Sequence, residues 1–179
     1  MDPILDKARA GRNLLERIVD KIPGFKGYQE RELRRDADQL QREHLANRLD
    51  ANKRALNDVA VAATRAGSMD LINDVETGRK RLDKLIARVR YADRGYSAFF
   101  DTVKIDEAVL ERVYQFDLGL LEGVEEIELA AHKAATAAEV TAAVRELTAR
   151  IDAMDARLAD REAIPVSYTH LTLPTNREV

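Results

Sequence analysis

Residues 29–66 read QERELRRDADQLQREHLANRLDANKRALNDVAVAATRA, a stretch that contains neither Pro nor Gly. Leucines recur in it at helical spacing among charged and amide residues, at Leu33, Leu40, Leu45, Leu49 and Leu56. This pattern predicts one long amphipathic helix. At roughly 1.5 Å per residue the helix would be about 57 Å long. No later stretch predicts a helix of that length. We therefore expect the apolar stripe of the 29–66 helix to decide where the other helices pack.

The apolar stripe of the long helix is broken by a five-residue step between Leu40 and Leu45. A change of packing partner would explain this break. We expect the N-terminal helix to cover the first part of the stripe and the helix after residue 66 to cover the second. Asn52 occupies an apolar position in the second part, where it either fixes the register, as single polar residues do in coiled coils, or lies at the edge of the seam.

An amphipathic helix is predicted before the long one. Asp2 is a suitable N-cap with Pro3 at the first helical position. Apolar residues then alternate at spacings of four and three, at Ile4, Ala8, Gly11, Leu15, Ile18 and Ile22. Pro23 and Gly24 end this helix, and the short connection to residue 29 favours an antiparallel pair of helices. Ile4, Leu15, Ile18 and Ile22 are therefore candidates for a packing face or a membrane-binding face.

Three further helices are expected after residue 66. Gly67 is a C′ glycine and Ser68 an N-cap for a helix from Met69 to about Arg94, in which Gly78 allows a close neighbour. At roughly 39 Å this helix would return along the long one only as far as residues 40–47. A helix after Asp106 has apolar residues at Val109, Val113, Phe116, Leu120, Val124 and Ile127.

The last predicted helix follows a capping box formed by Thr136 and Glu139. Its apolar residues keep an unbroken a/d rhythm, at Val140, Val144, Leu147, Ile151, Met154 and Leu158. Long heptad helices joined by short turns predict an all-α fold, an antiparallel helical bundle of coiled-coil type with about five helices.

Composition bounds the class of protein. The chain has 179 residues, is 45% hydrophobic and 34% charged, and contains no Cys. These values suit a single helical domain, and neither a disulfide framework nor a thiolate metal site is possible. No apolar run suggests a signal peptide or a membrane span, so the cytoplasm is the expected location. We divide the chain into an N-terminal amphipathic helix (1–22), a bundle (23–164) that includes or carries this helix, and a tail (165–179).

The tail differs in character from the helices before it. Val166-Ser-Tyr-Thr-His-Leu-Thr-Leu-Pro-Thr-Asn176 resembles the translation of a transposon-derived sequencing adapter, although a natural extended tail would also fit a stretch after a helix. The resemblance implies that residues 165–179 are not native, that the gene was read from environmental DNA, and that the natural chain continues differently after Ile164. These residues carry no weight in the fold or function arguments.

No motif for catalysis or cofactor binding is found. The patterns of phosphate-binding loops, dinucleotide-binding turns and nucleophile elbows do not occur. A di-iron bundle requires Glu-x-x-His twice, but Glu128 and His132 are four residues apart and Glu43 and His44 are adjacent. We therefore predict no catalytic, metal or cofactor residue. A non-catalytic interaction or scaffold protein, which binds a partner protein or itself, is the favoured function.

Two surfaces are candidates for interaction. The first is basic and comprises Lys26, Arg31, Arg34 and Arg35. Residues 1–35 hold nine Lys and Arg against six Asp and Glu, so a peripheral protein on an anionic membrane, at its inner face, is the second hypothesis. A solvated face of i, i+4 pairs explains the same charges, and nucleic-acid binding is a distant third because no nucleic-acid motif is present. The second surface is aromatic, a plug under one bundle end or a ligand pocket, at Tyr96, Phe99, Phe100, Tyr114 and Phe116.

Two short stretches carry a resemblance. Ile22-Pro-Gly-Phe-Lys-Gly-Tyr28, followed by Arg34-Arg-Asp-Ala-Asp38, and Gly95-Tyr-Ser-Ala-Phe-Phe-Asp101 resemble a group of uncharacterised bacterial all-helical proteins that share such a turn. The resemblance implies a bacterial source and brings no activity with it. An N-terminal amphipathic helix before long two-helix arms is also similar, in shape alone, to membrane-stress proteins of the phage-shock type.

Overall fold

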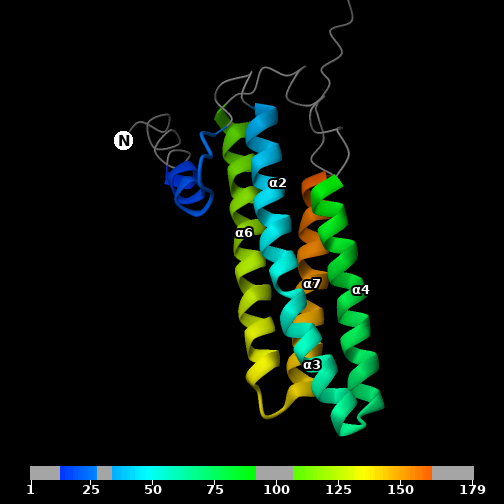
Figure 1. Ribbon diagram of the computed structural model, residues 1–179. Coiled ribbons are helices and arrows are strands. Elements are labelled where there is room, and N and C mark those ends of the chain that lie inside the picture. The colour runs from blue at the N-terminus through cyan, green and yellow to red at the C-terminus, as the bar shows by residue number, and fades with distance from the viewer. Residues whose placement is uncertain (1–12, 28–33, 92–106, 163–179) are drawn as a thin grey trace, which may run out of the picture.

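A computed structural model of the chain describes residues 13–27, 34–91 and 107–162. Within these ranges the fold is all-α, as predicted, and contains no strand. The bundle consists of α2 (Arg34–Ala51), α3 (Lys53–Ala66), α4 (Met69–Tyr91), α6 (Glu107–Thr136) and α7 (Val140–Glu162). Residues 13–21 form a further helix beside one end of the bundle, which we call the N-terminal helix (Figure 1).

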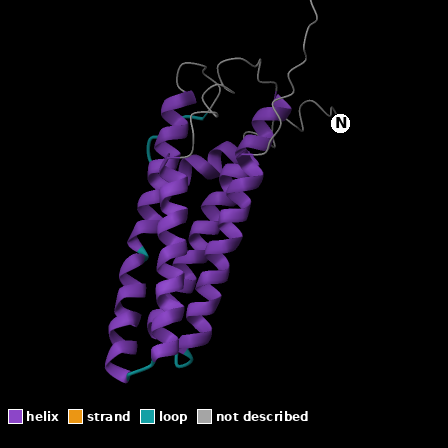
Figure 2. Ribbon diagram, turned by 90° about the vertical axis from the view of Figure 1, so that its right-hand side faces the viewer, coloured by secondary structure: helices purple, strands orange, loops and turns teal. Residues whose placement is uncertain are grey.

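The bundle is built from two helical hairpins that lie side by side (Figures 1 and 2). In the first, α2 and α3 continue one another as a rod and α4 returns along it; in the second, α7 returns along α6. Each hairpin is antiparallel, as predicted. Between the hairpins, however, neighbouring helices run in the same direction, since α4 lies against α7 and the α2–α3 rod lies against α6. The chain therefore passes from α4 to a diagonally opposite helix.

A ladder of ion pairs fixes the register of α4 against α7. Each pair joins residues that are 71 positions apart, so the two helices advance together. The first two pairs are one heptad apart, which is the spacing of a parallel coiled-coil seam. The pairs are Asp74–Arg145, Arg81–Asp152 and Lys84–Asp155.

The long helix is divided at Asn52 into α2 and α3. The Asn52 backbone N–H donates to Leu49 O, three residues back, at 3.1 Å. Its side-chain Nδ2 donates to Arg48 O, four residues back, at 2.9 Å. The Asn52 side chain thus binds Arg48 O, the carbonyl to which the Asn52 N–H would donate in a regular α-helix. The backbone N–H donates three residues back instead, as in a turn of 3₁₀-helix. Asn52 is buried, which favours a position within the seam over the alternative of a position at its edge.

The end of α4 lies beside the middle of α2, as the predicted lengths required. Arg90, next to the last residue of α4, donates through Nη2 to Asn47 Oδ1 at 3.3 Å. The part of α2 before this point has a different neighbour, because a Cβ added at Gly24 would lie 3.8 Å from Leu40 Cδ2. The connection after the N-terminal helix therefore makes this contact with the first part of the rod, which we had expected the helix itself to cover.

The expected antiparallel arrangement of the N-terminal helix and the rod is wrong. The ion pairs Arg17–Glu122 and Lys21–Glu125 show that this helix advances along α6 in the direction of α6 itself, which is also the direction of α2. After residue 21 the chain turns back. Gly27 lies beside Tyr114, near the start of α6, where an added Cβ would be 2.8 Å from the tyrosine oxygen. The chain reverses its direction in the connection after residue 21. The N-terminal helix and the α2–α3 rod therefore run in the same direction.

The turn between α3 and α4 forms as predicted. Gly67 adopts a left-handed conformation with φ of 65°, which a residue without Cβ reaches at little cost. Its N–H bonds to Thr64 O at 3.1 Å, and Ser68 N–H bonds to Ala63 O at 3.0 Å. This is the Schellman arrangement that satisfies the last carbonyls of a helix. Ile72 N–H bonds to Ser68 O at 3.1 Å, so Ser68 is the N-cap of α4.

The predicted capping box before α7 is wrong. Thr136 is the last residue of α6, and its Oγ1 donates to His132 O at 3.0 Å within that helix. The first turn of α7 closes instead with Ala143 N–H on Glu139 O at 3.2 Å, which makes Glu139 the N-cap. Ala131 and Ala134 are buried in the core, so packing extends α6 through the residue that was expected to cap its neighbour.

One core runs the length of the bundle. The a/d residues of α7 after Val140 are all buried, and Val140 itself is half-buried against them. The corresponding residues of α6 are buried from Val113 onward except Phe116, which is half-buried; the side chain of Val109 lies outside the described residues. The seam that the heptad pattern predicted is therefore confirmed.

Candidate functional site: the outer face of α6

Four residues define what we call the outer face of α6: Leu118, Glu122, Glu125 and Leu129. Their spacings of four, three and four keep them on one side of the helix. This side points away from Leu120, Val124 and Ile127, which face the bundle interior. The outer face is therefore available to a segment from outside the four-helix core.

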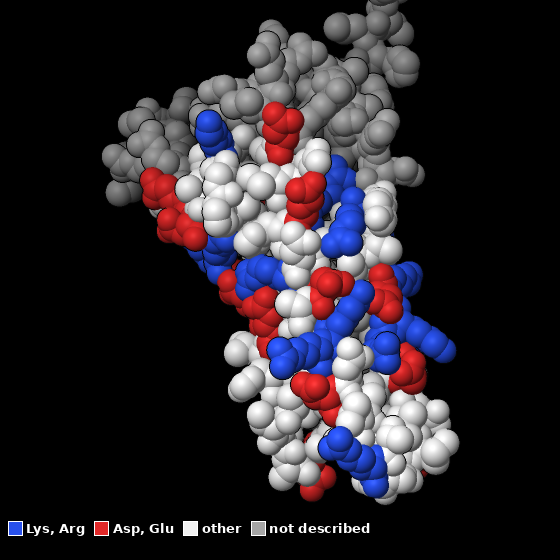
Figure 3. Space-filling model, in the orientation of Figure 1, with Lys and Arg blue, Asp and Glu red and all other residues white. Residues whose placement is uncertain are grey.

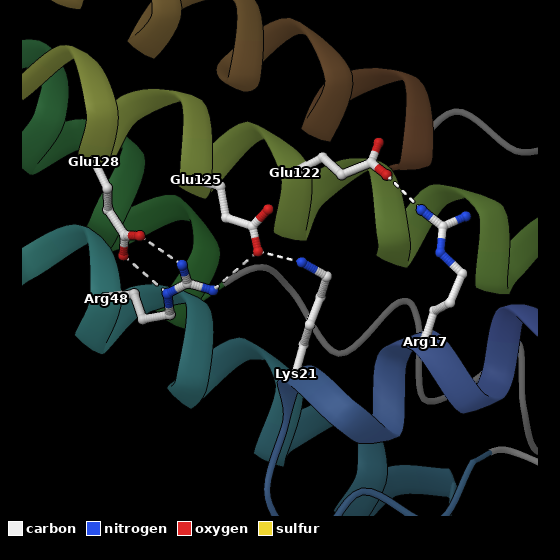
Figure 4. Close-up of polar contacts among 6 residues, drawn as sticks. All are labelled: Arg17, Lys21, Arg48, Glu122, Glu125 and Glu128. Carbon is white, nitrogen blue, oxygen red and sulfur yellow. Dashed lines mark hydrogen bonds and ion pairs between the residues drawn. The ribbon is translucent and has the colours of Figure 1, made fainter.

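The N-terminal helix covers the upper half of the outer face. Arg17 Nη2 lies 3.0 Å from Glu122 Oε1, and Lys21 forms an ion pair with Glu125 (Figure 4). Ile18, between the two basic residues in sequence, is fully buried. Leu118 is only 4% exposed although it lies opposite the bundle interior. Leu118 is therefore buried on the side of α6 to which the N-terminal helix is joined by two ion pairs.

The lower half of the outer face is open. Leu129 follows Glu125 by one turn and is 73% exposed. His132 and Lys133, on either side of the same face one turn further on, are also exposed. A leucine in line with the covered Leu118 is thus left in solvent where the N-terminal helix ends.

Glu125 and its neighbour Glu128 connect the N-terminal helix, α6 and α2. Arg48 of α2 binds Glu128 through two contacts, Nε–Oε1 at 2.8 Å and Nη2–Oε2 at 2.5 Å. Its third nitrogen, Nη1, is 4.0 Å from Glu125 Oε1, so Glu125 lies between Lys21 and Arg48 (Figure 4). The hydrogen bond that Arg48 donates to Glu128 raises the pKa of Arg48 despite its partial burial.

His44 lies one turn before Arg48 on α2 and responds to the same charges. Burial lowers its pKa, the positive charge of Arg48 lowers it further, and Glu128 partly opposes the effect. Its Nε2 atom is buried and has no hydrogen-bond partner among the described residues. A second positive charge beside Arg48 is disfavoured, so this histidine stays neutral at pH values where an exposed one is protonated.

The predicted basic surface is not assembled by the described residues. Lys26 is exposed in the connection after the N-terminal helix. Arg31 lies outside the described residues, and so do the side chains of Arg34 and Arg35, whose backbone begins α2. The face of the bundle in Figure 3 mixes Lys and Arg with Asp and Glu along its middle and is largely uncharged at its lower end. Mixed charges of this kind are typical of ion-paired helix faces.

The predicted apolar face of the N-terminal helix is used for packing. Ile18 and Ile22 are fully buried, Leu15 is half-buried against the core, and Ile4 lies outside the described residues. Of the predicted aromatic plug, Tyr114 is buried and Phe116 half-buried in α6. Tyr96, Phe99 and Phe100 lie outside the described residues.

The glutamates of α6 were considered from sequence only as metal ligands, and their pairing with basic residues was missed. Within residues 13–27, 34–91 and 107–162 no group of three or more potential ligands is placed to hold a metal ion. Glu126 pairs instead with Arg150 of α7 at 3.3 Å. The recurrence of Leu118, Glu122, Glu125 and Leu129 outside the a/d pattern was the available signal for a second binding face.

Comparisons with known proteins do not add to this geometry. No protein-family model matches the chain, and neither the curated proteins nor the solved structures contain a match. In the described part of the chain, every helix is too short or too polar to cross a bilayer.

Proposed function

We propose that the protein is a non-catalytic helical interaction module that associates with a second copy of itself through the outer face of α6. The observation that carries this proposal is the contrast between Leu118 and Leu129. Both lie on the outer face, but Leu118 is buried, on the side where the N-terminal helix is ion-paired to α6, and Leu129 is 73% exposed. A single exposed leucine is ordinary on a protein surface. Its alignment with an established helix-binding surface is what favours a partner.

Charges around Leu129 are arranged to complement themselves. If two α6 helices meet antiparallel about a two-fold axis at Leu129, residues after Leu129 on one edge of the contact lie near residues before Leu129 on the same edge of the second helix. At about 100° per residue, Lys133 and Glu126 lie on one side of Leu129, and His132 and Glu125 lie on the other. Lys133 then lies near Glu126 of the partner subunit, and His132 lies near Glu125 of the partner subunit. Each edge of the contact thus receives one basic and one acidic residue.

The present ion pair of Lys133 does not prevent this residue from pairing with a second copy. Lys133 Nζ lies 2.6 Å from Glu146 Oε2, and the side chains are 61% and 40% exposed. Ion pairs at such exposure contribute little stability and exchange readily with other charges. Since one leucine per subunit supplies most of the apolar contact, the association is expected to be weak and to weaken further with salt.

Sedimentation equilibrium over a concentration series up to millimolar tests this proposal. We expect the wild-type chain to form a dimer and Leu129→Asp to remain monomeric. Val61→Asp is the matched control, because Val61 is 50% exposed on α3 and is not on the outer face of α6. A wild-type chain that stays monomeric, or a dimer that both variants weaken equally, would contradict the proposal.

A peripheral membrane protein is the second candidate function. It is favoured by the position of the N-terminal helix, which lies on the outside of the bundle with Arg17 and Lys21 bordering its apolar side (Figure 4). Either function suits a reducing, cytoplasmic compartment, because the chain contains no Cys.

A further inference from the structure

The N-terminal helix has three kinds of surface. Its apolar side comprises Leu14, Leu15, Ile18 and Ile22, which pack against the core of the bundle. Arg17 and Lys21 lie one residue before Ile18 and Ile22, so they border this side. Glu16 and Asp20 are exposed, and the helical rotation of about 100° per residue places them on the opposite side. Basic residues at the border of an apolar side, with acidic residues furthest from it, suit a helix that lies in a membrane interface.

The bundle occupies every group that such a helix would use on a lipid surface. Ile18 and Ile22 are fully buried in the core. Arg17 and Lys21 are paired with Glu122 and Glu125, two carboxylates spaced along α6. An anionic bilayer offers the same combination, an apolar layer bordered by negative headgroups. The outer face of α6 therefore resembles, in its chemistry, the lipid surface with which it would compete for the N-terminal helix.

The attachment of the helix is reversible in physical terms. The Arg17 and Glu122 side chains are 55% and 48% exposed, and pairs at that exposure are weak and screened by salt. Gly24 and Gly27, which follow the helix, have φ values of 84° and 85°, so the connection includes residues that rotate with little steric cost. The apolar side of the helix is buried again in the bilayer, whereas apolar residues of the bundle that it leaves become exposed. The charges of Glu122 and Glu125 add to this balance on the side of the bundle.

We propose that the N-terminal helix binds anionic lipid surfaces and that Glu122 and Glu125 hold it in a masked position on α6. The inference rests on the second candidate function, and it shares Glu125 with the proposed self-association contact. It predicts that carboxylates on the bundle, which need not touch lipid, control how strongly the chain binds to it. Removing their charge should shift the helix from the bundle to the membrane.

Co-sedimentation with vesicles tests the inference. The vesicles contain phosphatidylcholine alone or mixed with phosphatidylglycerol. We expect Glu122→Gln with Glu125→Gln to raise the partition coefficient on anionic vesicles about threefold to tenfold, the effect of losing one exposed and one partly buried ion pair. The matched control is Asp74→Asn with Asp152→Asn, which removes two carboxylates that form ion pairs between α4 and α7. This control should bind like the wild type.

The inference has two parts, that the glutamates hold the helix on the bundle and that the released helix binds anionic lipid. Hydrogen exchange of residues 13–22, measured without vesicles, tests the first part separately. Faster exchange in the Glu122→Gln, Glu125→Gln variant together with stronger anionic binding supports it, provided that adding Ile18→Ser abolishes that binding. Faster exchange without vesicle binding, or equal binding to neutral vesicles, overturns the proposed lipid partner. If neither the double Gln variant nor charge reversal at Glu122 and Glu125 changes the exchange rate, these residues do not hold the helix on α6. Leu129→Asp should leave vesicle binding unchanged, so a failure of self-association is recognised separately.

Discussion

Arg48 of α2 and Glu128 of α6 form a two-point ion pair that joins the two hairpins, with Nε–Oε1 at 2.8 Å and Nη2–Oε2 at 2.5 Å. The side chains are only 25% and 35% exposed, so water screens this pair less than it screens a more exposed pair such as Arg17–Glu122. The planar guanidinium matches the carboxylate in a way that a lysine cannot. Because α2 and α6 run parallel, this contact also fixes how far one hairpin slides along the other.

Removing the Arg48 guanidinium should destabilise the bundle measurably. We expect Arg48→Ala to lower the free energy of unfolding by about 1–3 kcal/mol, because Glu128 loses a charged, half-buried partner. Arg48→Lys should recover only part of this loss. Urea denaturation measures the change, with Arg145→Ala as the control, whose exposed pair with Asp74 contributes about 0.5 kcal/mol or less. Equal effects at the two positions would show that the Arg48 contact has no special strength.

The hydrogen bond at Asn52 predicts a difference between two small substitutions. Asn52→Asp places a carboxylate oxygen where Nδ2 now donates to Arg48 O at 2.9 Å. Two acceptors then face each other in a buried position, and the free energy of unfolding should fall by about 1–3 kcal/mol. Asn52→Ala should cost less, because the backbone N–H of residue 52 can return to Arg48 O. Thermal unfolding of both variants at neutral pH checks the order.

Two helical glycines should respond oppositely to alanine. A Cβ added at Gly119 of α6 meets no atom within 4 Å, so Gly119→Ala should raise the free energy of unfolding by about 0.5–1 kcal/mol through helix propensity alone. At Gly78 of α4 the added Cβ would lie 3.0 Å from Thr148 Oγ1, whose hydroxyl donates to Val144 O at 2.9 Å. Gly78→Ala should therefore lower stability, by about 1 kcal/mol.

The origin of the Gly78 effect is tested by a double-mutant cycle with Thr148→Ala. If the hydroxyl causes the crowding, Gly78→Ala should become neutral or stabilising once Thr148 is shortened. An unchanged cost would mean that another contact of α4, such as its approach to Leu56 at 3.8 Å, limits the space.

His44 should make stability depend on pH near neutrality. Its pKa in the folded chain lies below the ordinary value of 6.5, mainly because of burial and then because of Arg48. Below about pH 6.5 the unfolded chain therefore binds a proton that the folded chain does not, and the free energy of unfolding falls as pH falls. Above that pH the contribution is constant.

Chemical denaturation between about pH 8 and about pH 5 tests this prediction. The wild type should lose stability relative to His44→Gln as pH is lowered. A constant difference between wild type and His44→Gln would show that the folded and unfolded chains protonate this histidine alike.

Much of the fold is already present in local sequence patterns. The Schellman turn at Gly67, the N-cap at Ser68 and the a/d seam of α7 follow from neighbours within a few residues. The position of Arg90 beside Asn47 follows from helix length alone. These features could be predicted because helix periodicity, capping and rise per residue depend on short-range chemistry.

Thr136 shows where local chemistry was insufficient. Its sequence context fits a capping box, yet α6 continues through it because Ala131 and Ala134 find a buried place in the bundle. Packing of a helix that began nearly thirty residues earlier outweighed a cap that contributes about 1 kcal/mol.

By itself, the sequence determined that the chain forms amphipathic helices, where most of them end, and which side of each is apolar. Only the tertiary structure decided that the two hairpins meet with parallel neighbours, that the N-terminal helix lies along α6, and that Glu122 and Glu125 bind Arg17 and Lys21. The physical reason is separation along the chain: Arg48 and Glu128 are 80 residues apart, and Arg17 and Glu122 are 105 apart. Helix periodicity shows which side chains need a partner. Several charged and apolar stripes could supply that partner, and the choice among them depends on how all the helices pack around one core.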